Sequence, residues 1–258
     1  MKIAVCVKQV PEGASAKIDP TTKRLDRSGE GALNHFDTNA VEEGLRLKDR
    51  TGDAEVVVIS LGPPGAADAL RKALAMGADR ALHISDEAAA GSDLVATSRV
   101  LAKALEREQA DLVLFGQQAS DADGAVLWAA VADRLRRPVI SQAAELTLTD
   151  GSLRVKRQTE FGYDVIETPL PAVVAVSDAI NEPRYPSLKG IMGAKRKPQE
   201  TLTVDDLGLS ADVVGEAGSQ TEVYALNQPP SRGESRRIEG DGNAAEAIVE
   251  FLAEKRLI

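Results

Sequence analysis

The sequence of 258 residues contains a single cysteine and only two histidines. One cysteine excludes an intramolecular disulfide, and so few thiols and imidazoles argue against a Cys/His zinc site. The chain starts with a strand-like run rather than a signal peptide, and no apolar run is long enough to span a bilayer. We therefore expect a cytoplasmic protein without a metal site and without direct membrane insertion.

Aromatic residues are also scarce, at 3% of the sequence, although 43% of the residues are hydrophobic. Alanine, valine and leucine must therefore fill the interior, which is typical of a parallel sheet covered by helices. Basic residues are outnumbered by acidic ones, and the formal net charge is −9. This balance argues against a general affinity for nucleic acid or for an anionic membrane surface.

Recognisable catalytic patterns are absent too. The sequence has no Ser/His/Asp or Cys/His set, no phosphate-binding P-loop and no paired catalytic acids at meaningful spacing. The SGGxDS-type loop of adenylating ATP pyrophosphatases is also missing. We expect a chain that binds and positions a ligand rather than an enzyme with catalytic residues of its own.

What the sequence does contain is a strand, a small-residue loop and a helix in immediate succession. Residues 112–116 are apolar, residues 117–125 are small or polar, and apolar residues return at helical spacing from Val126. The loop is therefore expected at the carboxyl edge of a parallel sheet, opening onto a helix N-terminus that favours phosphate. The alternative is an ordinary turn in which Asp121 or Asp123 caps the helix. The two aspartates resemble half of a calcium loop, but its downstream carboxylates are missing, so capping or binding ribose hydroxyls suits them better.

Strands and helices alternate along the first half of the chain, which predicts βαβ units and a parallel sheet. Apolar runs predict strands over residues 3–7, 55–61, 80–84 and 112–116, and helical spacing predicts helices over residues 38–50, 66–75 and 92–108. Asp37 or Thr38 is the expected cap of the first helix. The pattern then becomes β-like over residues 139–149, 153–158 and 163–168, with turns at Asp150-Gly151 and near Gly162. Residues 171–176 are fully apolar and predict a strand that returns to the main sheet.

The remaining segments interrupt this regular pattern. Residues 11–34 are polar and predict a small hairpin excursion around the turn at Asp19. Residues 178–201 hold no convincing periodic element, and a stretch of this length is usually functional or mobile. From Gly215 the composition turns polar, and residues 244–255 predict a final helix, capped by Asn243, that lies on a partner.

A few side chains near the predicted sheet edge could contact a ligand. Cys6 lies in an apolar strand, where an inert, buried thiol is the expectation. Phe36 could stack on a ring or pack in the core. Gln117 and Gln118 offer amide donors and acceptors that suit a nucleotide.

The most specific pattern is LPAVVAVSDAINEPRYPSLKGIMGAKRK, residues 170–197. Its succession of LPAV, NEPRY and SLxxIMxAKRK resembles the signature of the electron transfer flavoprotein beta subunit. Agreement extends over nearly the whole chain, in VKQVPE (7–12), LNHFDTNAVEE (33–43), ALAMGADRA (73–81), DLVLFGQQASDAD (111–123) and DDLGL (205–209). The chain is therefore identified as a member of this family.

The resemblance implies a heterodimer with an alpha subunit that carries most of the FAD contacts. It implies an α/β fold, with a Rossmann-like, doubly wound, mainly parallel sheet and an added β-hairpin region in residues 1–200. An extended C-terminal arm, residues 201–258, would wrap the alpha subunit. A structural AMP is expected at the strand ends, and Phe36 would approach the flavin. Carried over position by position, the cofactor-binding residues are Cys6, Asn34, His35, Phe36, Asp37, Leu61, Gly116, Gln117, Gln118, Ala119, Ser120, Asp121, Ala122, Asp123, Gly124, Ala125, Val126 and Leu127.

The resemblance also implies a recognition segment over residues 181–194. In the family, a leucine of this segment enters a hydrophobic pocket of an acyl-CoA dehydrogenase, and alignment places it at Leu188. Burial of one exposed leucine contributes about 1.5–3 kcal/mol of binding free energy, which is enough to hold a partner and still release it quickly. Expected partners are acyl-CoA or related flavin dehydrogenases and a quinone oxidoreductase, as in fatty acid β-oxidation. The partner-binding residues would be Arg184, Tyr185, Leu188, Ile191 and Met192.

Two other functions remain open from the sequence. Some family members bifurcate electrons and hold a second FAD where AMP otherwise sits. A protein of another class, a stand-alone adenine-nucleotide-binding regulator of the universal-stress type, would share the nucleotide loop. The recognition segment and the polar tail argue against this regulator.

Overall fold

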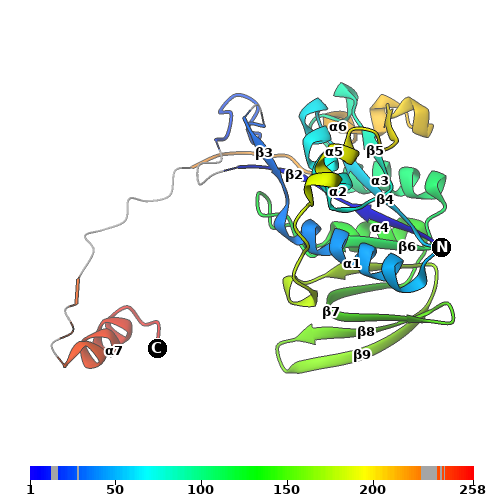
Figure 1. The fold of residues 1–258 in the computed structure, drawn as a ribbon. Coiled ribbons are helices and arrows are strands. Elements are labelled where there is room, and N and C mark those ends of the chain that lie inside the picture. Colours follow the sequence, from blue (N-terminus) through cyan, green and yellow to red (C-terminus); the bar gives the residue numbers. More distant parts are fainter. Residues whose placement is uncertain (13–16, 28, 228–236, 239, 241) are drawn as a thin grey trace. The chain divides into compact units, whose positions relative to one another are not determined.

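The computed structural model describes residues 1–12, 17–27, 29–227, 237–238, 240 and 242–258. These residues form two compact units, Met1–Val223 and Tyr224–Ile258, and each is described here by itself. The larger unit contains the sheet (Figure 1). The smaller unit contains the helix α7 (Ala244–Glu254), which Asn243 precedes as predicted. None of the described helices is both long and apolar enough to cross a membrane.

A sheet of nine strands forms the centre of the larger unit, in the order β11-β5-β4-β1-β6-β10-β7-β8-β9. Strands β11 to β7 pair in parallel, whereas β7, β8 and β9 pair antiparallel as successive hairpins at one side. The strands are β1 (Lys2–Cys6), β4 (Glu55–Leu61), β5 (Arg80–Ile84), β6 (Leu112–Gly116), β7 (Val139–Thr149), β8 (Ser152–Thr159), β9 (Gly162–Pro169), β10 (Ala172–Val176) and β11 (Gln199–Leu202). The prediction that the apolar run before Ser177 returns to the main sheet is confirmed, because β10 lies between β6 and β7.

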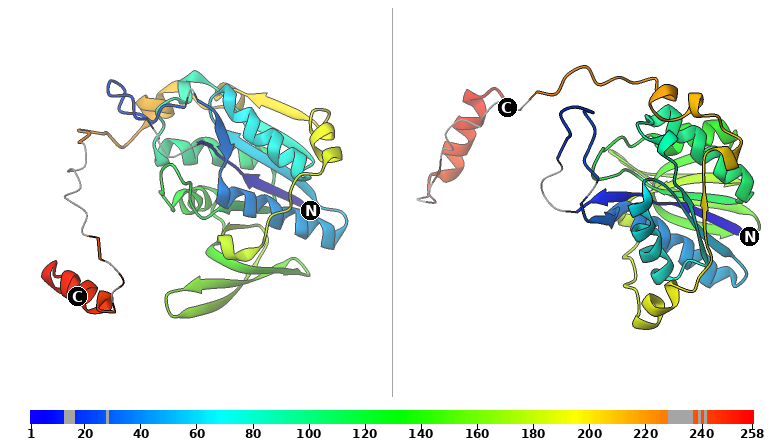
Figure 2. Two further views of the ribbon diagram at one scale, coloured as in Figure 1. Left: turned by 60° about the vertical axis from the view of Figure 1, so that its left-hand side comes forward. Right: turned by 90° about the horizontal axis from the view of Figure 1, so that it is seen from above.

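Helices cover both faces of the parallel part of the sheet (Figure 2). Ile3 and Val5 of β1 face one apolar cluster, whereas the alternate residues Ala4 and Cys6 face the other. The first face is covered by α1 (His35–Thr51), α2 (Ala67–Met76) and α5 (Leu188–Ala194), and the second by α3 (Leu94–Glu108), α4 (Leu127–Leu135) and residues 204–214. Because both faces are buried, the central strands are continuous apolar runs. The predicted doubly wound α/β fold is confirmed.

The predicted hairpin excursion is also present. β2 (Gln9–Pro11) pairs antiparallel with β3 (Gly31–Leu33), and Ile18 bridges to Leu25 around the turn at Asp19. The Asp19 carboxylate accepts hydrogen bonds from the backbone N–H groups of two residues in that turn. The part of the excursion over residues 13–16 and 28 lies outside the described residues.

Three local predictions are wrong. Residues 178–201 are not without regular structure, because they form α5 and β11. α5 has only seven residues, too few to show a helical period, and β11 is a mostly polar edge strand. The first helix begins at His35, so Asn34 rather than Asp37 or Thr38 occupies its N-cap position. At the start of α4 this position belongs to Val126, so neither Asp121 nor Asp123 is the cap.

Residues 201–223, placed by the prediction in the arm, pack within the larger unit. Their apolar residues Leu202, Val204, Leu207 and Leu209 belong to the cluster under α3. The wrapping of an alpha subunit by an arm that starts at residue 201 stays a prediction.

Candidate functional site

The winding of the sheet reverses at β1. The chain passes from β1 through α1 to β4 on one side, and later returns to β6 on the other side. The carboxyl ends of these strands, Cys6, Leu61 and Gly116, therefore lie at one edge of the sheet beside the start of α1. Such a switch point is where doubly wound proteins bind their ligands. The fold thus brings together the residues that the sequence selected from separate parts of the chain.

Asn34 fastens the loop after β6 to the start of α1. Its side chain is buried, and its Nδ2 donates to the carbonyl oxygen of Gln118 at 2.8 Å. Its Oδ1 accepts from the backbone N–H of Ser120 at 3.2 Å, and its own N–H donates to the carbonyl oxygen of Lys8 at 3.0 Å. One buried amide therefore sets the distance between β1, α1 and the predicted nucleotide loop.

Gly116 brings the end of β6 against the first turn of α1. A Cβ added at Gly116 would lie 2.4 Å from Oδ1 of Asp37 and 2.6 Å from the carbonyl carbon of Phe36. The Asp37 carboxylate is buried, and its Oδ2 accepts from the backbone N–H of Lys8 at 2.7 Å. Burial raises the pKa of Asp37 to about 7, against hydrogen bonds from Asn34, Lys8 and Gly116 that act to lower it.

Cys6 lies beside this carboxyl group at the end of β1. Burial, and then the charge of Asp37, raise the pKa of the Cys6 thiol well above its ordinary value. A thiol that stays protonated is a poor nucleophile, so the geometry gives Cys6 a packing role.

The loop over residues 117–126 is held in place by side chains on both of its sides. The Asp121 side chain is almost buried. Its Oδ1 pairs with Nζ of Lys8 at 2.7 Å, and its Oδ2 pairs with Nη2 of Arg27 at 2.6 Å. Burial alone would raise the pKa of Asp121, but the two cations outweigh it and lower the pKa. At the other end, Nε1 of Trp128 donates to the carbonyl oxygen of Gln117 at 3.1 Å. The Asp121 charge is therefore neutralised within the chain.

The middle of the loop exposes its backbone. Asp123 and Ala125 have φ angles of 44° and 45°, in the left-handed region that these residues seldom adopt. The exposed residues are Ser120, Ala122, Asp123, Gly124, Ala125 and Val126, and the half-buried ones are Gln117, Gln118, Ala119 and Leu127. An exposed, tightly turned backbone in front of the first N–H groups of α4 suits an anionic ligand such as a nucleotide phosphate. The ligand contacts themselves stay a prediction.

Two rings lie at the start of α1, next to this loop. His35 is exposed and Phe36 is half-buried, and their centroids are 5.7 Å apart in an edge-to-face arrangement. Phe36 therefore still has accessible ring surface for a flat ligand. Its approach to a flavin stays a prediction.

The predicted recognition segment projects four apolar side chains from the molecule. Tyr185, Leu188, Ile191 and Met192 are 93%, 75%, 53% and 67% exposed. Ser187 caps α5 by accepting from the backbone N–H of Gly190, and α5 packs tightly on α2 there. Clustered apolar groups of this kind mark protein contact sites.

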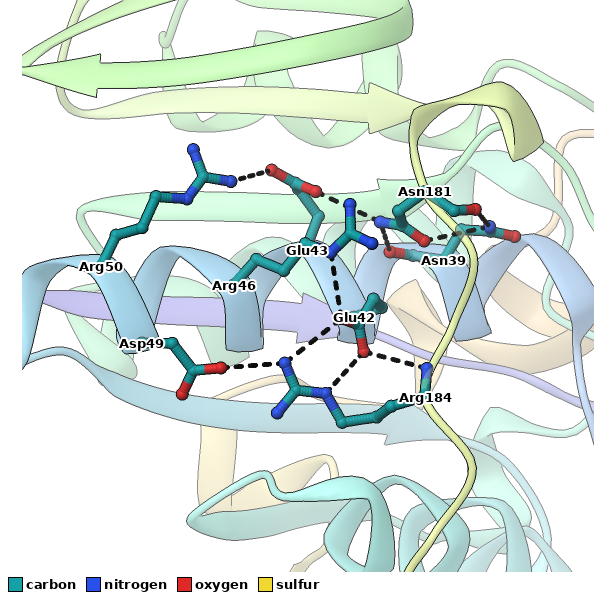
Figure 3. Close-up of polar contacts among 8 residues, drawn as sticks. All are labelled: Asn39, Glu42, Glu43, Arg46, Asp49, Arg50, Asn181 and Arg184. Carbon is teal, nitrogen blue, oxygen red and sulfur yellow. Dashed lines mark hydrogen bonds and ion pairs between the residues drawn. The ribbon is translucent and has the colours of Figure 1, made fainter.

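Arg184, for which partner contact stays a prediction, reaches towards α1 (Figure 3). Its guanidinium pairs with Glu42 and with Asp49, and Asn181 exchanges hydrogen bonds with Asn39 of α1. The segment is thus attached to the same helix whose first turn borders the nucleotide loop.

The sequence alone did not reveal the residues that hold the loop over residues 117–126 and the recognition segment. Lys8 and Arg27 hold Asp121, and Glu42 holds Arg184. The sequence did contain a signal for Glu42, because Glu42 and Glu43 directly follow the apolar Ala40 and Val41. In the structure all four residues are buried. Two adjacent acids inside a helix that packs on a sheet require partners from elsewhere in the chain.

The fold and the site define a class of protein, a doubly wound α/β domain with an exposed loop at its switch point and an exposed apolar segment. The sequence model of the family described as "Electron transfer flavoprotein domain" matches residues 22–207 of the chain. Full-length relatives agree with this match. The chain therefore belongs to the electron transfer flavoprotein family.

Three relatives illustrate the similarity. The beta subunit from Thermoanaerobacterium thermosaccharolyticum is 39% identical over the full length of both chains. The beta subunit from Megasphaera elsdenii is 38% identical over 99% of this chain and 97% of its own length. Subunit CarD of the caffeyl-CoA reductase-Etf complex from Acetobacterium woodii is 40% identical over the full length of both. The chain is of the beta-subunit type, with a role in electron transfer by a flavoprotein.

Proposed function

We propose that the chain is the beta subunit of a heterodimer that accepts electrons from acyl-CoA dehydrogenase-type flavoenzymes and passes them to a quinone oxidoreductase. The alpha subunit holds most of the FAD, and this chain holds a structural AMP. The observation that carries the proposal is the exposed apolar segment Tyr185–Met192 on a chain of the beta-subunit type. A carrier that must grip and release several enzymes needs a small apolar contact of this kind.

The chain's own residues support binding rather than chemistry at the AMP site. Gly116 leaves room for the close approach of β6 and α1, while Asn34 and Asp121 fix the loop. The exposed backbone of residues 120–126 and the start of α4 would hold the phosphate, and Gln117 or Gln118 the base or ribose. The bound flavin supplies the electron chemistry.

A cofactor count on the purified complex tests this proposal. Co-expression with the alpha subunit, followed by purification and release of bound nucleotides, should give one FAD and one AMP for each heterodimer. Two FAD would support the second candidate below. Failure to form a complex with an alpha subunit, together with adenine nucleotide binding by the single chain, would support the stand-alone regulator.

A second candidate is the beta subunit of an electron-bifurcating complex, with FAD in place of AMP. It is favoured by one comparison, the full-length similarity to a subunit of a caffeyl-CoA reductase-Etf complex. The same loop geometry would serve both ligands, since each contains an adenosine 5′-phosphate group. The cofactor count therefore separates the two candidates.

Leu188→Ala is expected to weaken docking of the dehydrogenase without loss of bound FAD or AMP. Leu188 is three-quarters exposed, so its burial in a partner should contribute about 1.5–3 kcal/mol, roughly a tenfold or greater rise in KM for the dehydrogenase. The measurement is reduction of the complex by an acyl-CoA dehydrogenase and its substrate at varied dehydrogenase concentration. Ile18→Ala, which trims another exposed apolar residue, is the control. Equal KM values for the two variants would remove Leu188 from the docking surface.

A further inference from the structure

The helix α1 contains two adjacent glutamates that are almost completely buried. Glu42 and Glu43 are 4% and 2% exposed. A buried carboxylate without a partner is strongly destabilising, so the groups that reach these two acids are required rather than incidental. Glu43 is paired with Arg50 of the same helix at 3.2 Å and accepts from Nδ2 of Asn181 at 3.2 Å.

Glu42 is paired with two arginines, one from its own helix and one from the proposed docking segment, which is the recognition segment over residues 181–194 (Figure 3). Nε of Arg46 lies 3.1 Å from its Oε1. Arg184 contacts both carboxylate oxygens, with Nε at 2.8 Å from Oε2 and Nη2 at 3.2 Å from Oε1, and its backbone N–H also donates to Oε2 at 3.1 Å. Nη2 of Arg184 also lies 2.9 Å from Oδ2 of Asp49. A two-point guanidinium–carboxylate contact of this kind fixes orientation as well as distance.

A second contact fixes the start of the same segment. Nδ2 of Asn39 donates to the carbonyl oxygen of Asn181 at 2.9 Å, and Nδ2 of Asn181 donates to the carbonyl oxygen of Asn39 at 3.0 Å. Arg184 follows three residues later, and Leu188 four residues after that. Beyond Arg184 the next side chain, Tyr185, is almost fully exposed, so Arg184 is the last firm attachment before the docking residues.

We propose that Arg184, held by Glu42 and Asp49, is a positioning residue that fixes the docking segment in the orientation a dehydrogenase binds. The inference rests on the proposed function, because it takes Leu188 and its neighbours as the docking surface. Arg184 then does not contact the partner itself. Its guanidinium faces α1, and it affects docking by orienting the segment that contains Leu188. Without the attachment, the segment would adopt the docking orientation only part of the time, and the apparent affinity would fall by that fraction.

Arg46 provides a matched control. Arg46 and Arg184 both pair with Glu42, and both side chains are 38% exposed. Arg46 lies within α1 itself and belongs to no docking segment. If the arginines only neutralised Glu42, their loss would have similar consequences. If Arg184 positions the segment, only its loss should affect docking.

The experiment compares Arg184→Gln, Arg184→Lys and Arg46→Gln in the purified heterodimer with bound cofactors. The donor is the acyl-CoA dehydrogenase that reduces the unmodified complex. For Arg184→Gln we expect a rise in KM of roughly tenfold with an unchanged kcat, and for Arg184→Lys a smaller rise because one contact to the carboxylate survives. Hydrogen exchange should become faster in residues 185–194 for Arg184→Gln but not for Arg46→Gln. FAD and AMP content should be the same in all three.

The outcomes separate this inference from the function on which it rests. If Leu188→Ala raises KM but Arg184→Gln does not, the docking surface stands and the positioning role is wrong. Equal rises in KM for Arg184→Gln and Arg46→Gln would also overturn it, because they would show general loosening of α1. If neither Leu188→Ala nor Arg184→Gln changes KM, the docking surface and its positioning residue are both wrong.

Discussion

Gly116→Ala should destabilise the protein by about 3 kcal/mol or more and should lower the AMP content of the heterodimer. The new methyl group would lie 2.4 Å from Oδ1 of Asp37 and 2.6 Å from the carbonyl carbon of Phe36. One of these contacts is backbone in the first turn of α1, which cannot rotate away. Either β6 or α1 must therefore move, and the loop that both support moves with them.

Gly124→Ala is the control for this change, since it adds the same methyl group to the same loop. No atom lies within 4 Å of a Cβ built at Gly124, and its φ is not in the left-handed region. Urea unfolding and the nucleotide content of both heterodimers provide the comparison. Wild-type stability in Gly116→Ala would show that the approach of β6 to α1 is looser than the structure has it.

Much of the fold could be predicted because local signals and tertiary packing agree. β6 and β10 are unbroken apolar runs because both faces of the sheet are covered. The turn between β7 and β8 was indicated by Asp150 and Gly151, whose positive φ angles of 49° and 77° suit that pair of residues. The switch-point loop could be located for the same reason, since a strand, small residues and a helix follow each other directly.

The rest depends on contacts between distant parts of the sequence, and these leave no periodic signal. Lys8 meets Asp121 across more than a hundred residues, and Glu42 meets Arg184 at a similar separation. α5 gives no core signal in the sequence, because its apolar residues Leu188, Ile191 and Met192 face outwards. β11 leaves no apolar signal in the sequence, because it is an edge strand and three of its four residues are exposed.

α1 contacts both of the sites proposed for this chain. Asn34 and Asp37 at its start border the loop proposed to bind a nucleotide, and Glu42 and Asp49 further along hold the segment proposed to dock a dehydrogenase. A displacement of this helix would therefore move both the loop and the segment. The stability of α1 depends on the protonation state of the buried Asp37.

Asp37→Asn is expected to change how stability depends on pH. Burial raises the pKa of Asp37 to about 7, so the neutral acid is favoured in the folded state. The resulting stabilisation is greatest at low pH and is lost as pH rises from about 4 to about 7. Between pH 5 and pH 8 this group should lower the free energy of unfolding by about 2–3 kcal/mol. An asparagine cannot ionise, so the variant should lack this component.

The same substitution has a cost that does not depend on pH. Asp37 accepts backbone N–H groups from Lys8 and Gly116, and the amide nitrogen of asparagine cannot accept one of them, at a cost of about 1–3 kcal/mol. The variant should thus be clearly less stable than wild type at pH 5, and the difference should shrink or reverse by pH 8. Urea unfolding of the heterodimers across this range measures it, with the exposed Asp123→Asn as control, because asparagine tolerates the left-handed φ there. A difference that stays constant with pH would mean that Asp37 is ionised throughout, and that its three donors outweigh its burial.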